Sequence, residues 1–318
     1  MRVEVPIKPA LVQELLEFWA DTFGDIPDLD PGALLGKDAG NNDYYLYVTQ
    51  RDGRVGGSCM TTHSLSVPSI GGFGEVATVP AIRGQGIATE LCSQAVEDFA
   101  SVGGQALFLG TGNGAAARIY HRLGWRKLPS TIVWANIPAG DSPESFLVEL
   151  FREQAPVTIS SGGPVDRVPI IPLIVTPHDW QVLDVNVSLY SSRYALVSGC
   201  MSLYPRYEAL EADGGGAWFS AHSGGGRVVG LSTAKLDDQG GCRVDGFSHG
   251  AFADARAGLI EAAASWGADR GVRIWSSVSV EDEEKLALLE SLGFQNVGTG
   301  KNFNMDGRIV GAMRLELS

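Results

Sequence analysis

Apolar and polar side chains alternate at the start of the chain and then change period. Residues 2–7 alternate in the two-residue period of a half-buried strand. After Pro9, apolar side chains recur at the spacing of one helix face; they are Leu11, Leu15, Phe18 and Trp19. The pattern predicts a strand followed by an amphipathic helix, and therefore a mixed α/β opening.

The next segments predict a hairpin and then a strand–turn–helix–strand unit. Residues 43–65 form two β-rich runs around Asp52–Gly53, a pair that favours tight hairpin turns. The stretch VATVPAIRGQGIATEL, residues 76–91, passes from a strand into a glycine-flanked turn and a helix over residues 86–102. Two glycines end this helix before the strand ALFLG. A short helix in NGAAARIYHRLGW and a strand in TIVWANI complete the first half.

A polar connector then precedes a second run of similar elements. Residues 138–168 are rich in Pro, Gly and Ser and contain one predicted helix, Glu144–Gln154. In chain order, the elements predicted after it are strand 169–175, helix 178–190, hairpin 217–236, strand 242–247, helix 253–271, strand 272–278, helix 283–294 and strand 311–317. This repeat predicts two tandem domains, residues 1–140 and 168–318, joined by a connector at 141–167.

The composition is that of a folded globular protein without membrane spans. Hydrophobic residues make up 44% of the chain and charged residues 19%, and no long apolar run occurs. The N-terminal residues lack the apolar stretch and cleavage site of a secretory signal. The four cysteines lie far apart without metal-binding spacing, which favours buried thiols over disulfides or metal ligands; they are Cys59, Cys92, Cys200 and Cys242. We therefore expect a cytoplasmic protein that holds no metal.

The charge balance argues against two classes of partner. The formal net charge is −13, from 24 Lys and Arg against 37 Asp and Glu. A negative protein repels nucleic acid and anionic lipid at long range, so neither is expected to bind. The same field would favour a cationic substrate such as an amine, although a solvated acidic surface is the simpler interpretation.

The turn RGQGIA has the composition of an anion-binding loop. Its glycines allow successive backbone N–H groups to converge, and the following helix adds the positive end of its dipole. It is not a P-loop, because no Lys-Ser or Lys-Thr follows its last glycine. The stretch GTGNGA nominally fits a dinucleotide motif, but its helix ends by Gly124 and no acidic residue closes the next strand. We therefore expect the first turn to bind a diphosphate through local donors, despite the negative net charge.

Together with a downstream pattern, this turn resembles the acetyl-CoA signature of the GNAT superfamily of N-acetyltransferases. The hallmark is Q/R-x-x-G-x-G/A, and Arg83, Gly86 and Ala88 occupy its positions. A second pattern, N-x-x-A-x-x-(L/I)-Y-x-x-x-G-(F/W), is met by Asn113, Ala116, Ile119, Tyr120, Gly124 and Trp125. The resemblance covers residues 1–137 by motif and the rest by element order. It implies two α/β (α+β) domains, each with a mixed, mostly antiparallel sheet flanked by helices, and acetyl-CoA as co-substrate.

The resemblance also assigns residues to the cofactor. It implies that the backbone of Val76, Ala77 and Thr78 pairs with the pantetheine arm. The residues implied to surround the diphosphate are Arg83, Gly84, Gln85, Gly86, Ile87, Ala88 and Thr89. Asn113 and Ala116 stand at the site of contact with the arm beyond the fifth strand. Because asparagine also caps helices, we expect a double role for Asn113.

Three residues are catalytic candidates. Tyr120 stands where the family often keeps a general acid that returns a proton to the CoA thiolate, although an aromatic residue on such a helix also suits a core. Glu75 is the first candidate base, because a carboxylate beside a water-filled cleft can accept a proton from an ammonium group; a strand-entry surface charge is the alternative. His63 is the second candidate, since imidazole titrates near neutral pH, and a structural histidine is its alternative.

The second half keeps the hydrophobic pattern and loses the signature. When GADRGVRI is aligned with SVGGQALF, the segment HGAFAD stands opposite RGQGIA. His249, Phe252 and Asp254 then replace the three hallmark residues, and a benzyl group and a carboxylate would oppose a phosphate. Further along, Leu289 replaces the tyrosine and Asp282 replaces the asparagine. We expect this half to bind no CoA and to form part of the acceptor pocket.

These observations predict an acetyl-CoA-dependent N-acetyltransferase that acts on the primary amine of a small molecule by direct attack. Two alternatives stay open. One is a non-catalytic acyl-CoA-binding or regulatory module, and the other is an acetyltransferase that acts on protein termini or lysines. The predicted assembly is a monomer or a homodimer.

Overall fold

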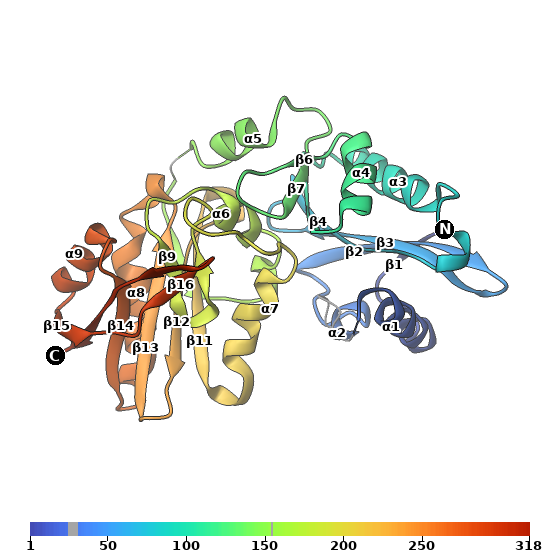
Figure 1. The fold of residues 1–318 in the computed structure, drawn as a ribbon. Helices are drawn as coiled ribbons and strands as arrows, with labels where there is room; N and C mark the ends of the chain where they lie inside the picture. The colour runs from blue at the N-terminus through green and yellow to red at the C-terminus, as the bar shows by residue number, and fades with distance from the viewer. Residues whose placement is uncertain (25–30, 154) are drawn as a thin grey trace.

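Two halves, each built on one large sheet, follow one another along the chain (Figure 1). The computed structural model describes residues 1–24, 31–153 and 155–318. The first-half strands are β1 (Arg2–Glu4), β2 (Asn42–Arg51), β3 (Arg54–Ser64), β4 (Ile70–Thr78), β5 (Ala106–Gly110), β6 (Arg126–Lys127) and β7 (Val133–Asn136). The first-half helices are α1 (Pro9–Phe23), α2 (Pro31–Leu34), α3 (Ile87–Ser101) and α4 (Gly114–Arg122). All of the helices and strands that the sequence pattern predicts in the first half are present.

The connector contains helix α5 (Pro143–Leu150), and the end predicted for it at Gln154 lies outside the described residues. The second-half strands are β8 (Thr158–Ser161), β9 (Val182–Asp184), β10 (Leu189–Tyr190), β11 (Gly216–Ser223), β12 (Arg227–Leu236), β13 (Gly241–Ser248), β14 (Arg273–Ser279), β15 (Phe294–Thr299), β16 (Phe303–Met305), β17 (Arg308–Val310) and β18 (Ala312–Leu317). The second-half helices are α6 (Ile170–Val175), α7 (Leu203–Glu208), α8 (Ala255–Ala268) and α9 (Glu283–Ser291).

The two large sheets have the same topology. The strand order is β1-β2-β3-β4-β5-β7-β6 in the first and β8-β11-β12-β13-β14-β18-β15 in the second, when both are read from the same edge. Neighbouring strands are antiparallel except for the pairs β4–β5 and β13–β14, which are parallel. The predicted fold class, two mixed and mostly antiparallel sheets flanked by helices, is confirmed. Strand β8 lies inside the predicted connector and pairs with the second sheet.

One hydrophobic core joins the two halves. It contains Ile70 and Phe108 from the first sheet, every residue of α6 except Pro172, and Val229 and Phe247 from the second sheet. Because each half buries part of its apolar surface against the other, the pair behaves as one packed body at this contact.

The structure corrects two predictions near this core. The apolar run at residues 169–175, predicted as a strand, forms helix α6, and every one of its six residues is buried. A short run that is apolar on all sides has no periodicity, so its sequence does not separate a buried strand from a buried helix. Packing between the halves therefore decides whether this run forms a strand or a helix.

The segment at residues 178–190, predicted as a helix, instead contains the short strands β9 and β10. Distant contacts determine this outcome. The Asp184 carboxylate accepts a hydrogen bond from the Thr233 hydroxyl at 2.8 Å, and the Asn186 amide donates to the Arg243 carbonyl at 3.0 Å. Buried polar groups that find such partners hold the chain in an extended path that helical spacing does not reveal.

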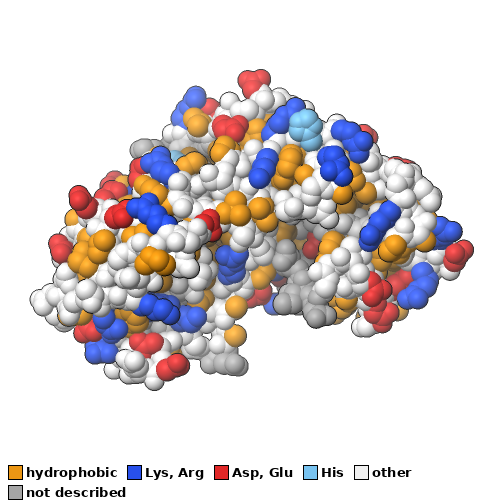
Figure 2. Space-filling model, viewed as in Figure 1, with side chains coloured by type: hydrophobic (Ala, Val, Ile, Leu, Met, Phe, Trp, Pro, Cys, Tyr) orange, Lys and Arg blue, Asp and Glu red, His pale blue; other side chains and the backbone are white. Residues whose placement is uncertain are grey.

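The surface carries both signs of charge. On the face drawn in Figure 2, acidic and basic side chains are interspersed, so the negative net charge is not gathered into one patch there. Among the described helices, none combines the length and the apolar character that crossing a membrane requires.

Candidate active site

The two parallel strands at the centre of the first sheet separate at one end. Strands β4 and β5 pair from Ile70 with Ala106 to Gly72 with Phe108, and the pairing stops there although β4 continues to Thr78. Beyond this point the inner edges of both strands line a cavity, through Phe73, Gly74, Glu75 and Val76 of β4 and Leu109 and Gly110 of β5. Strand edges that do not pair with each other can offer backbone hydrogen bonds to a ligand.

A β-bulge in β4 accompanies this separation. The register with β3 shifts by one residue, so that Glu75 and Val76 together lie opposite Cys59. Glu75 has a φ of 52°, in the left-handed region that non-glycine residues rarely adopt. Such a conformation costs about 1–3 kcal/mol and is maintained only by surrounding structure. The bulge redirects the strand edge at the mouth of the cavity.

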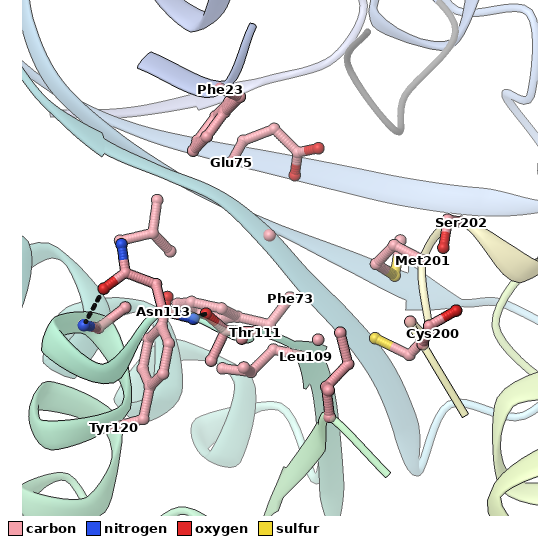
Figure 3. A pocket seen from close by; sticks show the side chains of 18 of the residues that line it. Phe23, Phe73, Glu75, Leu109, Thr111, Asn113, Tyr120, Cys200, Met201 and Ser202 are labelled. Carbon is pink, nitrogen blue, oxygen red and sulfur yellow. Dashed lines mark hydrogen bonds between the residues drawn. The ribbon is translucent and has the colours of Figure 1, made fainter. Parts of the chain in front are cut away.

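A larger groove adjoins the cavity. The inner cavity has a volume of ≈ 440 Å³ and the outer groove ≈ 1460 Å³. The two spaces adjoin each other, because four residues line both of them: Phe23, Val76, Asn113 and Ala116. Figure 3 shows the inner cavity between residues of the first half and a segment of the second half.

The outer groove runs over the turn between β4 and α3. Among the predicted cofactor residues, those that line it are Val76, Ala77, Thr78, Arg83, Gly84, Gly86, Ile87, Ala88, Thr89, Asn113 and Ala116. Gln85 is not in its lining. The acidic side chains of Glu90 and Glu97 also line the groove, alongside the basic side chains of Arg83 and Arg122.

The turn itself has the backbone of an anion-binding loop. Gly84 and Gly86 have φ values of 78° and 85°, and a Cβ built on either would meet no atom within 4 Å. Side chains at these positions would therefore be strained and would project into open space. The Arg83 Nε donates to the Thr78 carbonyl at 2.9 Å, which closes the turn. The 15-residue helix α3 then begins at Ile87 and directs its positive dipole end at the groove.

Asn113 caps the helix on the other side of the groove. Its side-chain oxygen accepts hydrogen bonds from the backbone N–H groups of Ala115 at 2.8 Å and Ala116 at 3.3 Å. The predicted capping role is therefore present. The same residue lines both spaces, so contact with a ligand is compatible with the cap.

Tyr120 reaches the inner cavity from α4. Its ring packs against Phe73 and Trp125, with centroid distances of 6.4 and 5.8 Å, and 5% of the residue is exposed. Burial raises the pKa of its hydroxyl well above the ordinary value, and the thiols of Cys92 and Cys59 add to the shift. The hydroxyl therefore keeps its proton at neutral pH.

Glu75 lines the same cavity from the bulge, and Figure 3 shows it across the cavity from Tyr120. Trp19 and Phe23 of α1 extend this wall. The arrangement brings an acid that holds its proton, a carboxylate and an unpaired strand edge around one space. These are the groups that proton transfer and carbonyl polarisation require.

His63 lies elsewhere. Its ring packs between Tyr45 and Phe99, at centroid distances of 4.7 and 4.9 Å, and its Nε2 lies 3.0 Å from the Thr61 hydroxyl. It lines neither the inner cavity nor the outer groove. Burial lowers the pKa of His63 to about 4, and the nearby Arg2 guanidinium adds to this effect. These surroundings match the structural alternative for this residue.

A segment of the second half completes the inner cavity. Its lining residues are Ser198, Gly199, Cys200, Met201 and Ser202. Just before this segment, Val197 bonds to first-half backbone: its N–H donates to Ser130 at 3.2 Å, and its carbonyl accepts from Ile132 at 3.0 Å. The second half is thereby anchored to the residues that lead into β7.

Close backbone contact fixes this wall. A Cβ on Gly72 would lie 2.2 Å from the Met201 sulfur, and one on Gly110 would lie 3.3 Å from the Gly199 backbone. A side chain at Gly72 would displace the Met201 side chain, and one at Gly110 would crowd the backbone of Gly199 and Cys200. Sequence reasoning did not find the segment, and its one signal was glycine within strands, which marks close approach of another group.

We call the space between the two separating parallel strands of a sheet its wedge. In the second half, other residues of that half fill this wedge. Strands β13 and β14 pair over three residues and then part, and the register of β13 with β12 has no bulge. The Val185 N–H donates to Asp245 of β13 at 2.7 Å, and the Gln181 N–H donates to Asp282 at the start of α9 at 2.7 Å. The Ser279 hydroxyl at the end of β14 donates to the Gln181 side chain at 2.9 Å. Residues 181–186 therefore occupy this wedge.

The structure also corrects the alignment of the two turns. A short 3-10 helix follows each central strand, at Pro80–Ile82 in the first half and Gly250–Phe252 in the second. By this criterion His249 corresponds to the residue before Pro80, and its predicted equivalence to Arg83 is wrong. Four residues separate the 3-10 helix from α3, whereas two separate it from α8. The second half is therefore shorter at the phosphate-type turn. The correspondence of Asp282 and Leu289 with residues of α4 is consistent with the helix positions.

Comparison with known proteins shows a family match within the first half. Residues 9–125 match the acetyltransferase (GNAT) family. No curated protein sequence matches the chain. Similar solved structures include spermidine N-acetyltransferase from Vibrio cholerae (15% identity, TM-score 0.39, 51% of this chain and 92% of that chain), a GNAT acetyltransferase from Streptococcus pneumoniae (15%, 0.38, 51% and 98%), and nourseothricin acetyltransferase (17%, 0.30, 33% and 66%). These TM-scores are low, so the sequence match carries the assignment. Residues 9–125 of this chain form an acetyltransferase domain of the GNAT family.

Proposed function

We propose that this protein transfers the acetyl group of acetyl-CoA to the primary amine of a small molecule. The observation that carries the proposal is the inner cavity, where Glu75, Tyr120 and the unpaired edge of β4 surround one space beside the groove over the turn. We propose residues 1–140 and 168–318 as the two domains and 141–167 as the connector, of which β8 belongs to the second sheet.

The chain fits acetyl-CoA as co-substrate. Gly84 and Gly86 leave open space where a side chain would otherwise stand, and the N-terminus of α3 faces the same groove. These features suit a diphosphate. The splayed edges of β4 and β5 lead from this groove to the inner cavity and suit an extended arm that carries amide groups. Arg83 and Arg122 add positive charge to the groove lining.

The proposed chemistry uses groups of this chain at each proton transfer. Acetyl-CoA supplies an activated acetyl group as a thioester. Glu75, directly or through water, takes a proton from the ammonium form of the acceptor. A backbone N–H of β4 donates a hydrogen bond to the carbonyl oxygen as the amine nitrogen forms its bond to carbon. Tyr120 gives its proton to the sulfur as the carbon–sulfur bond breaks, so that CoA leaves as a thiol. The acetylated nitrogen loses its excess proton, through water, to the Tyr120 phenolate, and Glu75 returns its proton to solvent. His63 has no part in this scheme.

The acceptor site is proposed to be composite. A cavity of ≈ 440 Å³ walled by both halves favours a compact molecule over a protein segment, because a peptide needs an open groove. Glu75 favours an acceptor that arrives as a cation. Trp19, Phe23 and Phe73 offer aromatic surface for the remainder of the molecule.

The test is release of free thiol from acetyl-CoA in the presence of a panel of amines, with acetylated products identified by mass spectrometry. We expect turnover with compact primary amines and none with their N-acetylated forms. Binding of acetyl-CoA without turnover on any amine would favour the acyl-CoA-binding alternative. Turnover only on peptides would favour the protein acetyltransferase alternative. The Tyr120→Phe variant serves as the control for enzyme-dependent release.

A further inference from the structure

A fully buried serine connects helix α1 to the bulge in β4. The indole N–H of Trp19 donates a hydrogen bond to the Ser58 Oγ at 2.9 Å. The Ser58 hydroxyl in turn donates to the backbone carbonyl of Glu75 at 2.6 Å. Ser58 is 0% exposed and Trp19 is 1% exposed. Each of these polar atoms is therefore removed from water and depends on its neighbour in the chain of bonds.

This chain of bonds ends at the one strained peptide of β4. In the bulge, Glu75 and Val76 together lie opposite Cys59 of β3, and Glu75 adopts a positive φ. The hydrogen bond from the Ser58 hydroxyl fixes the direction of the Glu75 carbonyl. Without it, that carbonyl would have to be satisfied in another orientation.

Fixing the carbonyl also fixes the next N–H. In a trans peptide the C=O of one residue and the N–H of the following residue point in opposite directions. Because the Glu75 carbonyl points to Ser58 on β3, the Val76 N–H points away from β3. Val76 lines both the inner cavity and the outer groove, where β4 and β5 have separated. We infer that an N–H of this residue that points away from β3 is available to a ligand in that space.

We propose that Trp19 and Ser58 are positioning residues for acetyl transfer. They hold the Glu75–Val76 peptide so that the Val76 N–H meets the thioester carbonyl oxygen and the Glu75 side chain stays at the cavity. This inference rests on the proposed function. It differs from a purely structural role, in which the same bonds would stabilise the sheet and leave the chemistry of the folded enzyme unchanged.

The first test is kinetic. Ser58→Ala removes the bond to the Glu75 carbonyl, and we expect kcat per acetyl-CoA site to fall about 10- to 100-fold, because one oriented donor is misplaced. The Kd for acetyl-CoA should change less than about threefold, since the groove over the turn is untouched. Sites are counted by calorimetry, so that loss of folded protein lowers the count and not the rate per site. Trp19→Phe, which keeps the Ser58 bond, should give a smaller fall.

The matched control is Ser64→Ala. Ser64 lies on the same strand, is 1% exposed, and accepts a hydrogen bond from the Val67 N–H at 3.1 Å, far from the bulge. This variant also loses a buried hydroxyl, so it reports the general effect on stability. We expect a lower melting temperature with kcat per site unchanged.

The second test needs no acceptor. Infrared difference spectra of bound acetyl-CoA, with and without a 13C label at the carbonyl, report hydrogen bonding to its oxygen. We expect the bound carbonyl stretch to lie below its value in solution for the wild type and for Ser64→Ala, and to return toward the solution value in Ser58→Ala. If the wild type shows this shift and no amine is acetylated, the proposed function fails, and what stands is the role of Ser58 in directing the Val76 N–H to the bound carbonyl.

Two results would overturn the inference. One is an unchanged carbonyl shift in Ser58→Ala, together with an unchanged kcat per site if an acceptor is found. The other is an equal loss in Ser58→Ala and Ser64→Ala, which would assign both serines to stability alone. A wild type that binds no acetyl-CoA would overturn this inference and the proposed function together.

Discussion

At the scale of single residues, Tyr120 combines a packing role with a place at the cavity. Its ring is held by Phe73 and Trp125, and its hydroxyl sits in surroundings that disfavour ionisation. A phenol that keeps its proton and a fixed direction suits a general acid. The sequence could place this residue on a helix face, but its distance from β4 depends on how α4 packs on the sheet.

We expect Tyr120→Phe to lower kcat by about 10²–10⁴-fold, the usual contribution of a positioned acid, and to leave the Kd for acetyl-CoA nearly unchanged. The substitution removes the hydroxyl and keeps the ring contacts. Steady-state kinetics under conditions in which chemistry limits, with calorimetry for binding, measure the two quantities. An unchanged kcat would assign this residue to the core.

Glu75→Gln and His63→Ala separate the two candidate bases. A base works only when deprotonated, so its loss removes the acidic limb of kcat/KM. We expect Glu75→Gln to remove that limb and His63→Ala to retain it. Because burial lowers the folded-state pKa of His63 to about 4 from 6.5, its contribution to stability is lost as pH falls through that window. Unfolding is therefore monitored at each pH. Loss of the limb in His63→Ala alone would reverse the assignment.

At the scale of elements, the turn between β4 and α3 and the bulge beside it form the site. The turn follows from local sequence, because glycines at positive φ and a helix start are properties of neighbouring residues. The bulge depends on pairing with β3 and on a bond from Ser58, which lies 17 residues away in sequence. Local pattern predicts the first kind of feature and gives no sign of the second.

We expect Gly86→Asp to weaken acetyl-CoA binding by at least about 100-fold, because it adds strain and a negative charge where a diphosphate would bind. The rise in melting temperature on adding acetyl-CoA should disappear; at a hundredfold excess over Kd a ligand stabilises by about 2.7 kcal/mol. Gly103→Asp is the control, since Gly103 also has a positive φ and open space at its Cβ but lies at the other end of α3. Equal loss of binding in both variants would contradict the role of the turn.

At the scale of the whole molecule, the two large sheets share one topology but differ in whether the space between their parallel strands is open. The first sheet opens a wedge to solvent, whereas residues 181–186 fill the wedge of the second and a shortened turn follows it. The second half instead contributes a wall to the first site through residues 198–202. We propose one composite site in each chain.

Calorimetry should therefore give one acetyl-CoA for each chain, and Gly86→Asp should reduce this number to zero. A second functional site would leave one after that substitution. A chain that ends at Pro138 should be poorly soluble or inactive on the same amine, because it exposes the core that Ile70 and Phe108 share with the second half. Full activity of that shorter chain would make the second half an independent module.

The sequence by itself determined the fold class, the tandem order and the hallmark turn. Amphipathic periods, glycine positions and motif spacing are local, and they led to α1, α3, α4 and the main strands. The tertiary structure decided the form of residues 170–190, the bulge at Glu75 and the wall at residues 198–202. These depend on contacts between residues 17 to more than 100 positions apart, such as the Glu75 carbonyl with Ser58 and Gln181 with Asp282. Such contacts leave no period in the sequence, because each forms only once segments that are distant in the chain have packed together.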